Sequence, residues 1–129
     1  MKARQEASLV PLPFEGYQRS KRVIGSGAYG AVYVGVGPGG TAIAVKVAYD
    51  GHQDFSREGE ILSALQGLSG VVQYITHDAQ HLVTRLLRGE DLQKKIHRGW
   101  KPAPLEAVGI AVSICQTLAS VHAFGIIHG

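Results

Sequence analysis

Hydrophobic and polar residues alternate along much of the first two thirds of the chain, and glycine-rich turns interrupt the alternation. Side chains of a strand point in turn to its two faces, so this pattern predicts β-strands. Turns are expected at the glycines before residue 31, at "GPGG" and at "HDAQ". The predicted strands cover residues 17–27, 30–37, 41–50, 71–76 and 81–87.

Helical spacing replaces the alternation in residues 54–68, where Ile61, Leu62 and Leu65 recur on one side. Asp54 or Ser56 is the expected N-terminal cap. Gly59 inside this helix costs up to about 1 kcal/mol relative to alanine. The segment is therefore expected to form a helix that depends on packing against its neighbours.

Two further helices are predicted, a short one over 92–99 and a long one from about Leu105 to Ala123. Residues 1–16 are expected to form a loosely structured arm. Strands with one intervening helix, followed by more helices, predict an α+β fold. The long helix has apolar residues around most of its circumference, so it is expected to be buried on several sides.

Composition narrows the classes of protein. The 129 residues carry a net charge of +3 without a dense run of Lys and Arg, which argues against nucleic-acid binding. The N-terminus lacks the apolar core of a secretory signal, and no apolar run approaches the roughly 18 residues of a membrane span. The single cysteine, Cys115, is expected to be a buried thiol in a reducing compartment. The expected location is the cytoplasm, with no membrane partner.

The segment "IGSGAYGAVYVG" contains Gly25, Gly27 and Gly30 in the spacing G-x-G-x-x-G. A dinucleotide-binding turn needs a helix after the third glycine, and the β-favouring residues that follow exclude one. A Walker loop needs Gly-Lys and then Ser or Thr, which is also absent. Two readings remain, a flexible hairpin turn and a hairpin whose glycines let backbone N–H groups approach phosphate oxygens.

Lys46 lies at the centre of an apolar strand and shares a face with Ala42 and Ala44. A buried lysine needs a partner, although an edge-strand lysine that reaches solvent is the alternative. The following helix offers two carboxylates. Glu58 has the helical spacing of the apolar face and Glu60 does not, so the predicted pair is Lys46–Glu58.

Taken together, these segments resemble the protein kinase superfamily, in the style of the eukaryotic-like serine/threonine kinases of bacteria. "IGSGAYGAVYVG" is similar to the glycine-rich loop, "IAVK" to the ATP-lysine strand and "REGEIL" to the helix with the ion-pair glutamate. "LVTRLLRGEDL" is similar to the hinge, with Arg85 at a position that is usually acidic. The resemblance implies a kinase N-lobe over residues 17–87 and part of a C-lobe over 88–129.

The resemblance implies ATP as the ligand and a role for each matching residue. Lys46 would hold phosphate oxygens, Glu58 would orient Lys46, and Thr84 would be the gatekeeper. The Arg85 carbonyl and the Leu87 N–H would bond the adenine, and Asp91 would reach the ribose. The full set of expected nucleotide contacts is Ile24, Gly25, Ser26, Gly27, Ala28, Tyr29, Gly30, Ala31, Val32, Ala44, Lys46, Thr84, Arg85, Leu87 and Asp91.

"GIIHG" at the end of the sequence resembles the start of the kinase catalytic loop, with His128 at the loop histidine and Gly129 in place of an arginine. The catalytic aspartate would come next. The resemblance therefore implies a chain truncated before its general base and its Mg²⁺ ligands, which binds ATP but is inactive alone. No metal site is expected within it, since His77 and His81 fall across a hairpin. The protein substrate is not indicated.

A second hypothesis belongs to a different class. The chain would be a natural half-kinase or pseudokinase-like binding module that complements or regulates a partner chain. The predicted helix over 105–123 would then be the complementing surface, because its apolar circumference calls for a partner.

Overall fold

A computed structural model describes residues 9–49 and 54–128 of the chain. They form two compact units. The first contains the residues up to Ala64 together with Val72–Leu86, and the second contains Leu65–Val71 and the residues from Leu87 onward. The kinase-lobe roles assigned to residues 17–87 and 88–129 remain predictions.

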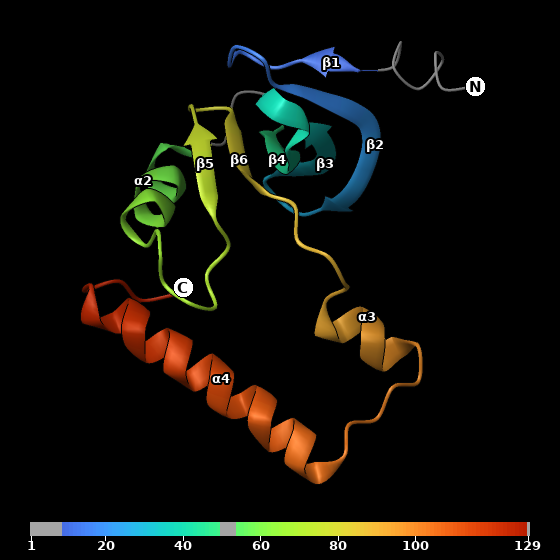
Figure 1. The fold of residues 1–129 in the computed structure, drawn as a ribbon, viewed down its shortest axis with the longest axis vertical. Coiled ribbons are helices and arrows are strands. Elements are labelled where there is room, and N and C mark those ends of the chain that lie inside the picture. Colours follow the sequence, from blue (N-terminus) through green and yellow to red (C-terminus); the bar gives the residue numbers. More distant parts are fainter. Residues whose placement is uncertain (1–8, 50–53, 129) are drawn as a thin grey trace. The chain divides into compact units, whose positions relative to one another are not determined.

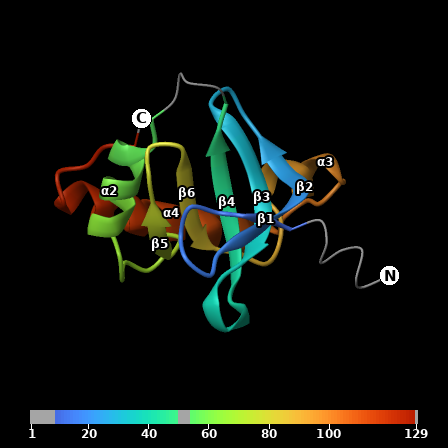
Figure 2. The same ribbon diagram turned by 90° about the horizontal axis from the view of Figure 1, so that it is seen from above.

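The first unit is built on a curled antiparallel sheet of six strands in the order β1-β2-β3-β4-β6-β5 (Figures 1 and 2). The α+β class predicted from the sequence is confirmed, with one strand more than expected. The pairing of β2 with β3 shifts register between Arg19 and Gly25, and irregular pairing of this kind bends a strand. The strands are β1 (Val10–Pro11), β2 (Gln18–Ser26), β3 (Gly30–Val36), β4 (Ala42–Ala48), β5 (Tyr74–His77) and β6 (His81–Arg85).

The additional strand corrects the prediction of a loose arm for the described part of residues 1–16. β1 pairs antiparallel with the start of β2, and Leu12 directly after it is only 8% exposed. The chain reverses between them through Gly16, whose φ of 82° a residue with a Cβ rarely adopts. Burial of Leu12 and Phe14 holds the segment against the sheet. Residues 1–8 of the predicted arm lie outside the described residues.

The hydrophobic core lies on one face of the sheet. Ile43 and Val45 of β4 and Val83 of β6 are fully buried, and Val45 lies directly opposite Val83. Each such side chain stabilises the fold by about 1.5–3 kcal/mol relative to an exposed position. The side chains that pack against this group are Leu12, Phe14, Tyr17, Val47 and Ile75.

The helix α2 (Ser56–Ala64) packs beside β5 (Figure 1). It begins where the Asp54 carboxylate accepts the Ser56 amide at 2.8 Å, so one of the two predicted caps is present. Phe55 is fully buried and its amide donates to the Ala79 carbonyl at 2.8 Å. These contacts attach the start of α2 to the turn between β5 and β6.

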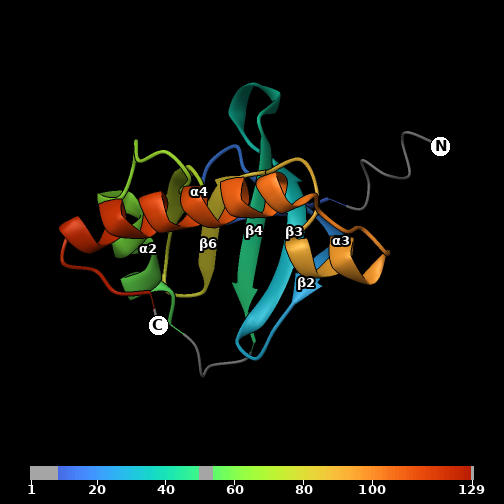
Figure 3. The same cartoon turned by 90° about the horizontal axis from the view of Figure 1, so that it is seen from below.

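The second unit contains α3 (Leu92–His97) and α4 (Pro104–Ala123), both close to their predicted bounds (Figure 3). The segment 65–71 packs against α4. The Thr117 hydroxyl lies 3.4 Å from the Ser69 carbonyl, and a Cβ on Gly70 would fall within 3.0 Å of the Thr117 side chain. Gly70 therefore permits close contact between this segment and the helix.

Much of α4 is exposed, which contradicts the expectation of a buried thiol at Cys115. Its apolar residues lie on several sides, and the described residues of this unit bury only Val121 among them. Within the described part of the chain α4 also has the length and composition of a membrane span, with a mean hydropathy of 1.4. α4 is not an unbroken apolar run, so its length and hydropathy are weak evidence for a membrane span, and the expected absence of a membrane partner stays a prediction. Core helices of soluble proteins have the same properties, so the finding does not establish a membrane partner.

Candidate functional site

The face of the sheet opposite the core carries Lys46. In the antiparallel register Val32 lies opposite Lys46, and Lys46 lies opposite Leu82. Two pairs further along, Ala44 lies between Val34 and Thr84. Directly opposed residues share a face, so the predicted lysine, Ala44, Val32 and Thr84 are brought together on one side of the sheet.

Lys46 is paired with Glu58 of α2, as the helical spacing predicts. Its Nζ lies 3.2 Å from both carboxylate oxygens of Glu58. Glu60, the alternative, is exposed and lies on another side of the helix. The Lys46 ammonium also lies 5.2 Å from the centre of the Phe55 ring, within the range of a cation–π contact.

Stability alone does not explain this ion pair. The side chains of Lys46 and Glu58 are 33% and 44% exposed, and a pair so accessible to water contributes only about 0–1 kcal/mol. Lys46 nevertheless occupies a strand in which apolar residues alternate, where an aliphatic side chain would cost less. The pair places a cation, held by one carboxylate, where water and a ligand can reach it.

The glycine loop is a tight hairpin between β2 and β3. The Gly27 amide donates to the Gly30 carbonyl at 3.0 Å, and the tip is joined to the end of β4 by a bond from the Tyr49 amide to the Tyr29 carbonyl. Residues 26–29 are exposed, and Tyr29 is 61% accessible. The predicted contacts Ile24, Ser26, Ala28 and Ala31 lie in or beside this hairpin.

The three glycines of the loop have different structural needs. A Cβ on Gly30 would fall within 3.0 Å of the Val47 carbonyl oxygen, so the pairing of β3 with β4 requires glycine there. A Cβ on Gly25 would make only ordinary contact with Val32, and one on Gly27 would meet nothing within 4 Å. Neither has a positive φ among the described residues. Folding thus explains Gly30, whereas Gly25 and Gly27 leave an open backbone that a ligand can approach.

The predicted hinge divides between the two units. Thr84 and Arg85 end β6, where the Arg85 amide donates to Gln73 and the Leu86 amide to Ala42. Leu87 is 69% exposed and is the first residue of the predicted hinge that belongs to the second unit. The hydrogen bonds of Leu87 to adenine and of Arg85 to adenine remain predictions.

Asp91 also has a structural role that was not predicted from the sequence. One carboxylate oxygen accepts the Lys94 amide at 2.7 Å and caps the N-terminus of α3. An acidic residue directly before a predicted helix is the sequence signal that would have indicated this N-terminal cap. The ribose contact proposed for Asp91 remains a prediction.

Two polar pairs on the β5–β6 hairpin were also missed. The Tyr74 hydroxyl lies 2.7 Å from His77 Nδ1, and His81 Nδ1 lies 2.9 Å from the Asp78 carboxylate. Partial burial would raise the pKa of Asp78, but hydrogen bonds from the side chain of His81 and the amide of Gln80 outweigh burial and lower it. Both pairs stabilise the hairpin that supports α2.

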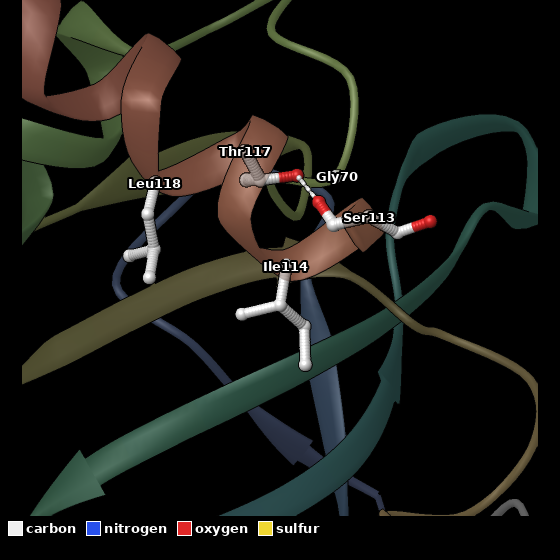
Figure 4. A pocket seen from close by; sticks show the side chains of 5 residues that line it. All are labelled: Gly70, Ser113, Ile114, Thr117 and Leu118. Carbon is white, nitrogen blue, oxygen red and sulfur yellow. Dashed lines mark hydrogen bonds between the residues drawn. The ribbon is translucent and has the colours of Figure 1, made fainter. Parts of the chain in front are cut away.

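A cavity of about 330 Å³ lies elsewhere, in the second unit, and none of its lining residues belongs to the predicted site. In Figure 4 Ile114 and Leu118 project side by side from α4, while Thr117 faces Gly70 and bonds to Ser113. The lining is mainly apolar and contains no charged side chain. In the described ranges 9–49 and 54–128, no three His, Cys, Asp or Glu residues gather in a metal-binding group.

No known protein-family profile matches the chain. The chain is similar to a curated protein, the serine/threonine-protein kinase PkaB of Streptomyces coelicolor, with 31% identity over 120 residues. The match covers 83% of this chain but only 28% of the relative. The similarity supports a relationship to serine/threonine protein kinases. The curled antiparallel sheet with α2 is consistent with the α+β N-terminal lobe of that superfamily.

Proposed function

We propose that the chain is the ATP-binding portion of a serine/threonine protein kinase. The contact of Lys46 with Glu58, on the face that also carries Val32 and Ala44, is the observation that supports it most directly. This arrangement fixes an ammonium beside a glycine hairpin, where anionic phosphate oxygens would bind. The similarity to a kinase along most of the chain points the same way.

The residues present fit a nucleotide. Gly25 and Gly27 leave the hairpin backbone without a Cβ in the way of a phosphate group, and Lys46 supplies a positive charge for phosphate oxygens. Val32 and Ala44 offer an apolar surface for a flat ring, beside Thr84 on the same face of the sheet. Glu58 would keep Lys46 pointed toward the phosphates.

The residues present do not fit the metal that a complete kinase employs. Phosphoryl transfer needs carboxylate or amide ligands for Mg²⁺ and a base for the attacking hydroxyl. The described ranges hold no cluster of metal-binding side chains, and neither Lys46 nor Glu58 serves as that base. We therefore propose that these 129 residues alone bind ATP and transfer no phosphate. The cytoplasm is the proposed location, and the protein substrate stays open.

Isothermal titration with ATP in the presence of EDTA tests the proposal. We expect saturable one-site binding that Lys46→Met weakens by about tenfold or more, since a charge-assisted phosphate contact contributes more than about 1.4 kcal/mol. Lys101→Met, which removes an exposed lysine outside the predicted site, is the matched control and should bind like the original chain. Equal affinity of the Lys46 variant and the control would refute the proposed site. Labelled γ-phosphate transfer to a mixed peptide library should stay at background.

The exposed residues of α4 favour one alternative, a half-kinase or pseudokinase-like binding module. Leu105 is 86% exposed and Val108 58%, and exposed apolar residues on one helix are typical of a surface that a partner covers. Hydrogen exchange of α4 would slow when a separate chain with the rest of a kinase large lobe is added. Unchanged exchange would exclude the complementing role.

A further inference from the structure

Gly59 is the one buried residue of α2, and its neighbour is the ring of His77. A Cβ at position 59 would fall within 3.0 Å of three ring atoms of His77, Cγ, Cδ2 and Nδ1. Real Cβ atoms essentially never come so close. The backbone of α2 therefore lies directly on the imidazole of β5, closer than any other residue type would permit.

The ring on which Gly59 lies is itself braced. His77 Nδ1 is 2.7 Å from the Tyr74 hydroxyl, and the two ring centres are 5.6 Å apart with a tilt of 58°. In a regular strand, two residues three positions apart have their side chains on opposite faces of the sheet. A register shift between Tyr74 and Thr76 brings them together instead. A hydrogen-bonded ring in a strand moves aside less easily than a free one.

This contact lies one residue from the predicted site. Phe55, fully buried, fixes the first turn of α2 through its bond to the Ala79 carbonyl, and Gly59 fixes the next turn four residues later. Glu58 lies between these two attachments and extends to Lys46, with both carboxylate oxygens 3.2 Å from Nζ. A helix held at two points one turn apart can neither rise from the sheet nor rotate freely.

We propose that the contact of Gly59 with His77, braced by Tyr74, is a positioning device that sets the distance of α2 from the sheet. Through that distance it holds Glu58 in register with Lys46. Gly59 and His77 would touch no ligand, and both are positioning residues. The inference rests on the proposed nucleotide site, although its structural part can be measured without nucleotide.

The first test uses Gly59→Ala, with Gly109→Ala as the matched control. Gly109 also lies within a helix, and a Cβ there would meet nothing within 4 Å. We expect Gly59→Ala to weaken ATP binding by about tenfold, because a charge-assisted contact depends steeply on geometry. Gly109→Ala should bind like the original chain. Gly59→Ala with His77→Ala in the same chain should regain affinity, since the smaller side chain leaves room for the added methyl group.

Combining Gly59→Ala with Glu58→Gln distinguishes an effect of Gly59 through Glu58 from a general effect on the fold. If Gly59 acts through Glu58, adding Gly59→Ala to Glu58→Gln should not lower the affinity of the folded protein further. Full additivity of the two losses would overturn the proposal. If Gly59→Ala does not fold, His77→Ala alone tests the proposal. Removing the imidazole on which Gly59 packs should also weaken ATP binding. Unchanged affinity in His77→Ala would overturn the proposal.

The last measurement distinguishes this inference from the function on which it rests. The ¹³C shift of the Glu58 side-chain carboxylate reports its contact with Lys46 in the absence of any nucleotide. Gly59→Ala should move this signal toward that of Lys46→Met, and the added His77→Ala should return it. A moved signal without ATP binding in any variant would refute the nucleotide site and leave the positioning contact intact. A signal unmoved by Gly59→Ala would overturn the positioning contact.

Discussion

Val32 lies directly opposite Lys46 in the pairing of β3 with β4, so the glycine hairpin and the lysine are joined by the sheet itself. The same register places Gly30 opposite Ala48, where a Cβ on Gly30 would meet the Val47 carbonyl. Any ligand beneath the hairpin would therefore meet Val32 and Lys46 at a fixed separation. The geometry of the predicted site depends on this register more than on the flexibility of the loop.

Two glycines of the hairpin should respond oppositely to a methyl group. Gly30→Ala should lower the free energy of unfolding by about 1–3 kcal/mol, because its Cβ would collide with the Val47 carbonyl. Gly27→Ala has open space and should leave stability unchanged or raise it by about 0.4–1 kcal/mol. Its added Cβ should weaken ATP binding several-fold. Urea denaturation with ATP titration of both variants measures this, and a large stability loss in Gly27→Ala would contradict the separation of roles.

The core face should be sensitive to side-chain size. Ile43 is fully buried, so Ile43→Ala should lower the free energy of unfolding by about 2–5 kcal/mol through lost burial and a residual cavity. Val23→Ala in β2, at a position 49% exposed, is the control and should change it by less than about 0.5 kcal/mol. Urea denaturation by circular dichroism gives both values. Similar losses in the two variants would show that the core is misplaced.

Most of the fold was predictable because its periodicity is local. The alternation in β3 and β4 and the spacing in α4 are properties of the sequence itself, and those elements lie close to their predicted bounds. β1 was missed because two residues carry no period, and its position depends on where Leu12 finds a core. The burial of Cys115 was wrongly predicted for a related reason. Helix composition does not reveal which side its neighbours cover.

Within the candidate site, the partner of Lys46 was predictable from spacing, whereas the support beneath it was not. Glu58 was preferred over Glu60 because it shares the apolar side of α2, and the structure has Lys46 in contact with it. The bond between Tyr74 and His77 arises from an irregular register that alternation does not encode. Side-chain contacts of this kind depend on the pairing of β5 with β6.

The cap of α2 should make stability depend on pH. Hydrogen bonds from the side chain and the amide of Ser56 lower the pKa of Asp54 below its ordinary value. Because the folded-state pKa lies below the unfolded one, the stabilisation is fully present above the unfolded value and is lost as pH falls through the folded value. Urea midpoints at about pH 6 and about pH 3 should differ less in Asp54→Asn than in the original chain. Identical pH dependence in the two proteins would show that protonation of Asp54 does not contribute to the pH dependence of stability.

The two tasks proposed for Asp91 can be separated by one variant and one ligand. Asp91→Ala should weaken the cap of α3 by about 0.5–2 kcal/mol, while Asp91→Asn keeps an oxygen for the Lys94 amide and should preserve it. A carboxylate on the ribose would also bind its 2′-hydroxyl more strongly than a neutral amide does. Asp91→Asn should therefore weaken binding of ATP but not of 2′-deoxy-ATP, measured by titration. An equal loss for both nucleotides, or none for either, would leave Asp91 with the helix cap alone, because only a ribose contact distinguishes the two ligands.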